Sequence, residues 1–149
     1  MPMIDVTTAS GVFAPAAKRE LTARLTAALM KWEKAPDIAL FRDNTAAFVH
    51  ELPVEAIATA AGAHTGIRVR IETPAGALDR ESKLGVVAEM TRIVAEVAGD
   101  PSQAQRTWVL CAEAPDGGWG IAGYAYTRAD IGEAVRRELA QIDLHASSE

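Results

Sequence analysis

Residues 21–32 read LTARLTAALMKW, and the spacing of the large apolar residues in this stretch decides the fold. The same spacing returns 65 positions later in the chain, so that Leu21, Leu25, Leu29 and Trp32 correspond to Val86, Met90, Val94 and Val97. Steps of four, four and three residues place such side chains on one face of an α-helix. The pattern therefore predicts two amphipathic helices, near residues 14–34 and near residues 79–98.

The sequence around the two predicted helices repeats as well. Three identities share the offset of 65 residues: Gly11 with Gly76, Lys18 with Lys83, and Pro36 with Pro101. Short β-like runs flank each helix, at residues 3–7, 45–51, 67–71 and 107–113. We therefore expect an α+β fold, in which two tandem β-α-β units form a four-stranded mixed sheet with two helices on one face.

A chain of 149 residues suits a single domain, here with pseudo-repeats at about 2–53 and 67–126. After the second repeat, residues 127–130 (TRAD) resemble a capped helix start, and Ile131, Val135 and Leu139 follow at four-residue spacing. This predicts a C-terminal helix at about 127–144. Two helices cover only one face of the sheet, so we expect another copy of the chain to bury the other face.

Composition excludes several classes of protein. The 15 basic and 20 acidic side chains give a formal charge of −5 without a basic stripe, so nucleic acid is not an expected partner. The sequence has no apolar run of membrane-helix length and no signal-peptide pattern, so we expect no membrane contact and a cytoplasmic location. Cys111 is the only cysteine, and His64 and His145 have no second ligand at metal spacing, so neither a disulfide nor a metal is expected. No glycine-rich phosphate loop follows a strand, and no cofactor is expected.

Two segments carry a resemblance to a known family. The chain begins MPMIDV, and its second half places Arg106 five residues after Pro101, followed by the predicted strand 107–113 and by GWGIAG at residues 118–123. This order resembles the 4-oxalocrotonate tautomerase type of the tautomerase superfamily. The resemblance spans residues 2–126, with two subunit-sized units fused as in the longer dehalogenase and decarboxylase branches. It implies a homotrimer that acts on a small-molecule substrate.

The resemblance also implies a catalytic site. Members of the family expose a proline after loss of the initiator methionine, and Pro2 matches that proline. A free α-amino group titrates near about 8, and burial beside cations disfavours its charged form, so Pro2 is expected to act as a general base. Arg106 matches the arginine that holds a substrate oxygen, although a solvated strand-end role explains it equally well. Trp119 matches the aromatic pocket wall, and packing at a subunit interface is its structural alternative.

One feature of the family pattern is missing. Family members usually place an arginine in the turn after the strand that opens a unit, but here Val12 and Ala77 follow Gly11 and Gly76. The expected two-arginine carboxylate clamp is therefore absent. We assign Arg70 to the substrate pocket as a substitute, with Arg42 and Arg80 as alternatives, although a solvated or ion-paired role explains each of these arginines as well.

Three functions stay open at this point. The first expectation is tautomerase or isomerase-type proton transfer on a small carbonyl or enol substrate. A non-catalytic oligomeric protein with the tautomerase fold is the second, because the clamp is missing. The third is a proline- and glutamate-dependent hydratase or dehalogenase, because Glu113 matches a position where hydrolytic dehalogenases of the superfamily activate water. Glutamate is also ordinary there in plain tautomerases.

Overall fold

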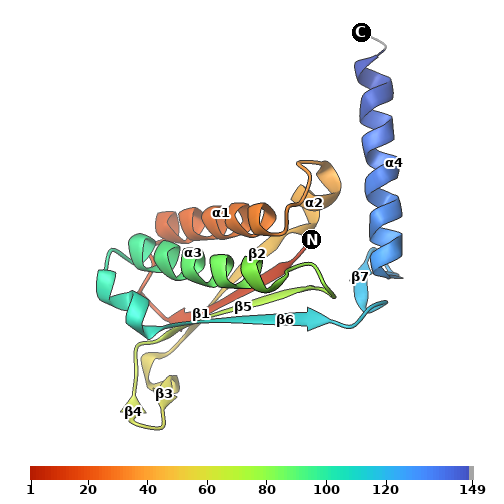
Figure 1. Ribbon diagram of the computed structural model, residues 1–149. Coiled ribbons are helices and arrows are strands. Elements are labelled where there is room, and N and C mark those ends of the chain that lie inside the picture. Colours follow the sequence, from red (N-terminus) through yellow and green to blue (C-terminus); the bar gives the residue numbers. More distant parts are fainter. Residues whose placement is uncertain (148–149) are drawn as a thin grey trace.

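The computed structural model describes residues 1–147 and is built on one four-stranded sheet (Figure 1). The order of its strands is β2-β1-β5-β6, with bounds β1 (Met3–Ala9), β2 (Ala46–Leu52), β5 (Ile67–Pro74) and β6 (Thr107–Ala114). β1 is parallel to β2, β5 is parallel to β6, and the two pairs meet antiparallel between β1 and β5. The mixed sheet of two β-α-β units that the repeat predicts is confirmed.

Two long helices, α1 (Pro15–Trp32) and α3 (Arg80–Ala98), lie side by side on one face of this sheet (Figure 1). Their contact is close because Gly85 has no side chain: a Cβ there would stand 2.1 Å from Cη2 of Trp32. The core is made by the predicted helix faces and by the alternate residues of the central strands. Its fully buried members include Leu21, Leu25, Leu29, Val86, Met90, Val94, Ile4, Val6, Val69 and Ile71. Burial of this apolar area stabilises the layered arrangement.

The pairing of the strands decides which residues can meet at each end of the sheet. Met3 at the start of β1 is opposite Glu72 near the end of β5. At the other end of the sheet, Thr7 is opposite Arg68, and Ile67 is the partner of Thr107. The N-terminus therefore lies beside the last residues of β5 and β6, whereas the first residues of β6 lie at the far end.

Smaller elements complete the structure. The connector between the repeats contains a 3-10 turn, η1 (Val54–Ala56), and the hairpin of β3 (Ala58–Thr59) and β4 (Gly62–Ala63). A 3-10 helix, η2 (Pro101–Arg106), precedes β6. A second hairpin, β7 (Trp119–Ile121) with β8 (Tyr124–Tyr126), follows β6. A short helix, α2 (Ala39–Asn44), was not predicted. It has only one buried residue, Phe41, and six residues are too few to show helical periodicity.

The predicted C-terminal helix is present as α4 (Arg128–Ala146). It begins with a capping box, in which Thr127 and Asp130 exchange side-chain and backbone hydrogen bonds. Ile131 and Val135 pack against the body of the protein, and the distal half of the helix projects away from it (Figure 1). Within residues 1–147, no helix is both long and apolar enough to cross a membrane.

The face of the sheet opposite α1 and α3 carries exposed apolar side chains. Phe48, Trp108 and Leu110 are 51%, 44% and 47% exposed, and Arg68 and Arg70 alternate with the buried residues of β5. A monomer seldom leaves so much aromatic and aliphatic surface in contact with water. This is the face that the sequence predicts another copy of the chain to cover.

Candidate active site

The N-terminus is buried at the end of the sheet where α1 ends and α4 begins. Met1 is 1% exposed, and its side chain packs in a cluster of buried residues with Ile38, Phe41, Ala114 and Trp119. Its ammonium lies 2.9 Å and 3.1 Å from the two carboxylate oxygens of Glu33. Pro2 is also buried, and its carbonyl accepts a hydrogen bond of 3.2 Å from the backbone N–H of Ala46. Strand pairing thus fixes the first residues of the chain in the interior.

The surroundings of the N-terminus favour uncharged groups. Burial lowers the pKa of the Met1 ammonium, against the attraction of Glu33, which raises it. Burial likewise raises the pKa of Glu33, against the opposing effect of the ammonium. For both groups desolvation is the larger cause, so the ion pair does not recover what burial costs. An amine held at this point is shifted toward its neutral, basic form.

Glu33 stands in an unfavourable place for a structural carboxylate. It is the C-cap residue of α1, at the negative end of the helix dipole, and its side chain is only 5% exposed. Lys34 follows with a φ of 54° and ends the helix. A buried carboxylate at a helix C-terminus lowers stability unless a cation accompanies it, which favours a functional role for Glu33.

A pocket of about 450 Å³ opens beside Met1. Its walls come from the end of α1, the turn between β5 and α3, Phe41 of α2, and the first half of α4. The charged side chains on its lining are Glu33, Lys34, Arg128 and Arg136, and its apolar side chains include Met1, Phe41, Ile131 and Val135. A concave, mainly apolar site of this size with a few charged groups suits a small organic molecule.

Trp119 is the sequence-predicted residue that the structure places nearest to the N-terminus. It is 7% exposed and belongs to the same cluster as Met1. Its indole N–H is buried and has no hydrogen-bond partner among residues 1–147. Trp119 is not on the lining of the pocket, so this N–H, whose lack of a partner costs about 1–3 kcal/mol, could be reached only by a ligand that occupies the space of Met1.

Glu113 and Arg70 are not on the lining of this pocket. Glu113 lies at the end of β6, at the same end of the sheet as Pro2, but its carboxylate is 3.3 Å from the Lys83 ammonium and about one third exposed. Arg70 lies on the open face of β5, opposite Asp5, with its guanidinium 3.9 Å from Glu72. Within one chain, Arg70 therefore lies on the open face of the sheet and not beside the pocket.

Arg106 lies at the far end of the sheet from Pro2. It is the last residue of η2, directly before β6, and its guanidinium contacts the carboxylate of Asp100 at 3.1 Å. Further hydrogen bonds of the guanidinium to Ser102 and Gln103 hold it in place. Within one chain the structure therefore does not bring Arg106 and Pro2 together.

Sequence reasoning missed the four charged residues that line the pocket: Glu33, Lys34, Arg128 and Arg136. Glu33 gave no signal, because a glutamate near the end of an amphipathic helix usually faces solvent. The two arginines did leave one, because they stand eight residues apart on the predicted C-terminal helix with Gly132 midway between them. Residues four apart share one face of a helix, so this spacing describes a stripe with two cations.

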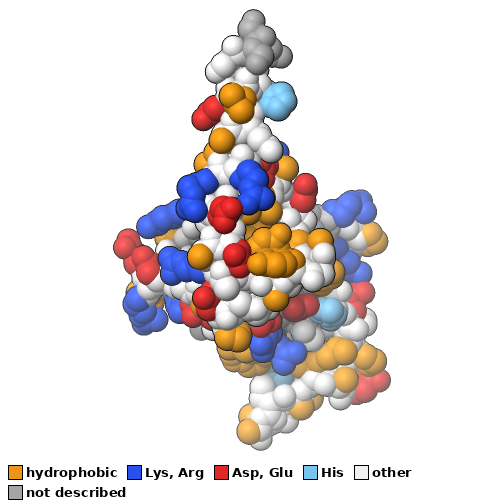
Figure 2. Space-filling view, turned by 90° about the vertical axis from the view of Figure 1, so that its right-hand side faces the viewer, with side chains coloured by type: hydrophobic (Ala, Val, Ile, Leu, Met, Phe, Trp, Pro, Cys, Tyr) orange, Lys and Arg blue, Asp and Glu red, His pale blue; other side chains and the backbone are white. Residues whose placement is uncertain are grey.

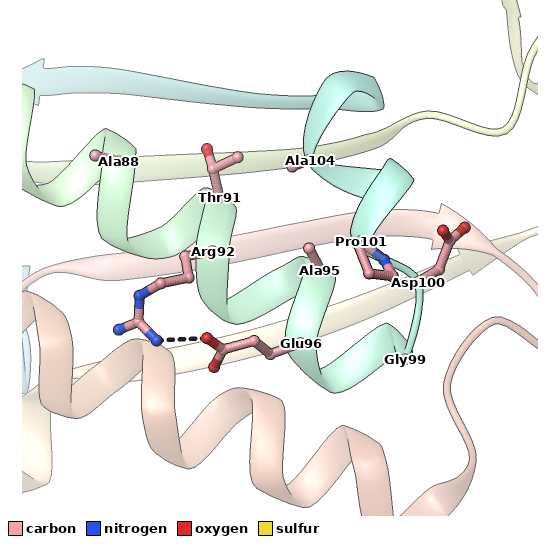
Figure 3. A pocket seen from close by; sticks show the side chains of 9 residues that line it. All are labelled: Ala88, Thr91, Arg92, Ala95, Glu96, Gly99, Asp100, Pro101 and Ala104. Atoms are coloured by element: carbon pink, nitrogen blue, oxygen red, sulfur yellow. Dashed lines mark hydrogen bonds and ion pairs between the residues drawn. The ribbon is translucent and has the colours of Figure 1, made fainter.

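A second, larger pocket of about 630 Å³ lies between α3 and η2 (Figure 3). Alanines and Gly99 form much of its lining, and its charged groups are paired: Arg92 with Glu96 at 2.7 Å, and Asp100 with Arg106. Figure 3 shows the Arg92–Glu96 ion pair on the wall of the groove. Because the charged groups on its lining are paired and the Thr91 hydroxyl donates to the carbonyl of Val87 at 2.8 Å, this groove is the poorer candidate for catalysis.

Comparison with known proteins agrees with the fold. The sequence model of a family described as "Tautomerase enzyme" matches residues 68–127, whereas no curated protein sequence matches the chain. The structure of native fused 4-OT is 26% identical, with a TM-score of 0.71 over 87% of this chain and 98% of that chain. The Q0 fused 4-OT symmetric trimer is 20% identical, with a TM-score of 0.73 over 87% and 98%. N1, a member of the cis-3-chloroacrylic acid dehalogenase family, is 16% identical, with a TM-score of 0.73 over 93% and 99%.

Proposed function

Because this chain is a tautomerase-superfamily protein with two fused β-α-β units, we propose that it transfers a proton on a small carbonyl or enol substrate. The nitrogen of Pro2 is the general base, and loss of Met1 frees it. The observation that carries this proposal is the burial of the N-terminus beside a pocket of about 450 Å³. Met1 fills part of the space that a substrate would occupy, so its removal both creates the base and enlarges the site.

Each step of the reaction has a group to perform it. The neutral amine of Pro2 accepts a proton from the enol oxygen or from the carbon next to a carbonyl, and the resulting ammonium returns a proton to the alternative atom. The indole N–H of Trp119, which has no partner among residues 1–147, can donate to the substrate oxygen where negative charge develops once the substrate takes the space of Met1. The same proton leaves and returns, so the reaction requires no co-reactant.

We propose that the active assembly is a homotrimer. The exposed apolar residues on the open face of the sheet support an interface there, and a fused 4-OT of the same fold forms a symmetric trimer. A trimer also offers a role for Arg106, which lies too far from Pro2 of its own chain. We propose that Arg106 completes the site of a neighbouring subunit, where its guanidinium would hold a substrate oxygen.

Intact mass and covalent labelling test the central proposal. We expect the purified protein to lack Met1, and a 3-halopropiolate-type reagent to modify the nitrogen of Pro2, as located by peptide mapping. A protein that keeps Met1, or an unmodified Pro2 in a sample without Met1, would contradict the proposal. Either result would favour the non-catalytic oligomer, in which Met1 permanently fills the pocket.

Glu33 provides a prediction about pH. Its carboxylate raises the pKa of the Met1 ammonium in the full chain. We propose that it acts in the same sense on the Pro2 amine once Met1 is lost, and Glu33→Gln removes that attraction. The neutral form of the amine then exists at lower pH, so the acidic limb of the kcat/KM profile should move to lower pH. The cations Lys34, Arg128 and Arg136 also lower the pKa of a nearby amine, and the variant leaves them in place. An unmoved limb would show that the Pro2 amine does not sense Glu33.

The dehalogenase or hydratase alternative rests on Glu113, and the structure favours it less. The Glu113 carboxylate pairs with Lys83 and does not line the pocket next to Met1. The variant Glu113→Gln, prepared beside Glu33→Gln, separates the two readings because proton transfer by Pro2 does not need a water-activating carboxylate. Turnover of an enol substrate should survive the change at Glu113.

A further inference from the structure

Arg128 and Arg136 of α4 line the pocket beside Met1, and the function proposed above gives neither of them a role. Both side chains are exposed to solvent, and within residues 1–147 neither guanidinium has a hydrogen-bond or ion-pair partner. Neighbouring Arg137, by contrast, is paired with Glu133 at 2.8 Å. Figure 2 shows basic side chains gathered where the projecting helix meets the body of the protein.

The first half of α4 is fixed to the rest of the chain, so these arginines have a defined place. The capping box sets the start of the helix, and the backbone N–H of Arg128 donates to the carboxylate of Asp116 at 2.7 Å. One helical turn beyond Val135, the carboxylate of Glu138 accepts a hydrogen bond of 3.2 Å from the backbone N–H of Leu40. Arg128 and Arg136 therefore stand on a docked segment rather than on the projecting one.

Each guanidinium group lies next to a glycine, and only the approach to Gly76 is too close for a Cβ. A Cβ at Gly76 would stand 2.4 Å from Nη1 of Arg128, so the guanidinium lies directly over the turn between β5 and α3. A Cβ at Gly132 would stand 3.5 Å from Nη1 of Arg136, so the Arg136 side chain folds back along α4 toward Gly132. Eight helical residues span about 12 Å, which is within the joint reach of two arginine side chains. Both can therefore contact one ligand lying over Gly132.

The position over Gly76 matters because this turn lacks an arginine of its own. Ala77 stands there, so the turn carries no cation to hold an acidic group. The stretch that matches the tautomerase family ends at residue 127, and α4 begins at residue 128. The cations over the turn thus come from an element outside the matched stretch.

We propose that Arg128 and Arg136 bind the carboxylate of a small acidic enol or keto substrate, and that α4 is the specificity-determining wall of the site. This rests on the function proposed above. The planar guanidinium of an arginine binds a carboxylate through two parallel, charge-assisted hydrogen bonds. Of the other charged groups on the pocket lining, Lys34 adds a positive charge and Glu33 a negative one, so three cations stand against one carboxylate. The net positive charge selects an anion and holds it within the space that Met1 leaves.

The test compares an acid with its carboxylate-free counterpart. Turnover of phenylenolpyruvate and of the enol of phenylacetaldehyde is measured for the protein without Met1 and for Arg128→Gln and Arg136→Gln. Each variant should raise KM for the acid by about tenfold or more, because a charge-assisted hydrogen bond is lost, and should leave kcat/KM for the carboxylate-free enol within about twofold. Arg137→Gln, on the same helix but paired outside the pocket, should behave as the parent protein. Equal losses for both substrates, or none for either, would overturn the proposal.

A second variant adds bulk without removing charge. Gly132→Leu replaces a helical glycine by a better helix former, so the protein should fold, but the new side chain enters the pocket between the two arginines. Calorimetric titration with phenylpyruvate should show at least tenfold weaker binding to Gly132→Leu and to Arg128→Gln than to the parent. Unchanged affinity in both variants would overturn the arginine site. Because binding is measured without turnover, a failure of Pro2 to act as a base would leave this result intact.

Discussion

A chain that retains Met1 is expected to turn over an enol substrate about 100- to 10,000-fold more slowly than the same chain without it, which is the range that general acid–base groups contribute. Two physical causes act together. The nitrogen of Pro2 is an amide while Met1 is attached and therefore cannot accept a proton. In addition, the side chain of Met1 is buried within the cluster of Phe41 and Trp119 and fills substrate space.

The comparison requires the two forms of one chain, prepared with and without removal of Met1 and verified by intact mass. Ketonisation of phenylenolpyruvate, followed by absorbance, supplies the rates. Pro2→Ala without Met1 is an informative third sample, because it keeps a free amine but loses the ring, and it should fall between the other two forms. Equal rates for the forms with and without Met1 would refute a base at Pro2.

The fold followed from the sequence because one physical pattern occurs twice. Leu21, Leu25 and Leu29 are fully buried, as are Val86, Met90 and Val94 at the corresponding places in the second repeat. A helix with large apolar side chains on one face buries that face by packing on a sheet. Because a strand precedes and another follows each helix, the two strands of each β-α-β unit are parallel. The segment GWGIAG at residues 118–123, which the sequence analysis used only for the family resemblance, lies in the hairpin of β7 and β8.

Only part of the candidate site could be predicted from the sequence. Pro2 and Trp119 could be named because the resemblance pointed to their positions; in the structure Pro2 is buried next to Met1, and Trp119 packs in the same cluster as Met1. Glu33 lies at the end of α1, Arg128 at the start of α4 and Arg136 near the middle of α4. The periodicity of a helix predicts which face is buried but not which other element its polar residues contact. Their meeting depends on tertiary contacts between α1, α4 and the turn at Gly76, which no local pattern encodes. Arg106, by contrast, could be named from its sequence pattern, but it lies far from Pro2 of its own chain. In our proposal it completes the site of a neighbouring subunit.

The unsatisfied indole of Trp119 gives a prediction in which activity changes much more than stability. Trp119→Phe keeps an aromatic ring in the cluster with Met1 but removes a buried N–H that has no partner within residues 1–147. Removal of an orphan donor relieves about 1–3 kcal/mol, which offsets the packing lost with the smaller ring, so the free energy of unfolding should change by no more than about 1 kcal/mol. Turnover should nevertheless fall by about 100-fold or more, because a donor to the developing oxyanion is gone.

Trp32→Phe is the matched control, because the indole of Trp32 has the opposite surroundings. Its N–H donates to the carboxylate of Glu89 at 2.7 Å, and its ring packs on Gly85 of α3, away from the pocket beside Met1. Loss of a hydrogen bond to a charged group should lower the free energy of unfolding by about 1.5–3 kcal/mol, with turnover unchanged. Urea unfolding and enol turnover, measured on both variants, therefore distinguish an N–H that serves a ligand from one that serves the fold. If Trp119→Phe instead loses stability and keeps its turnover, Trp119 is a packing residue and the oxyanion donor must be sought elsewhere.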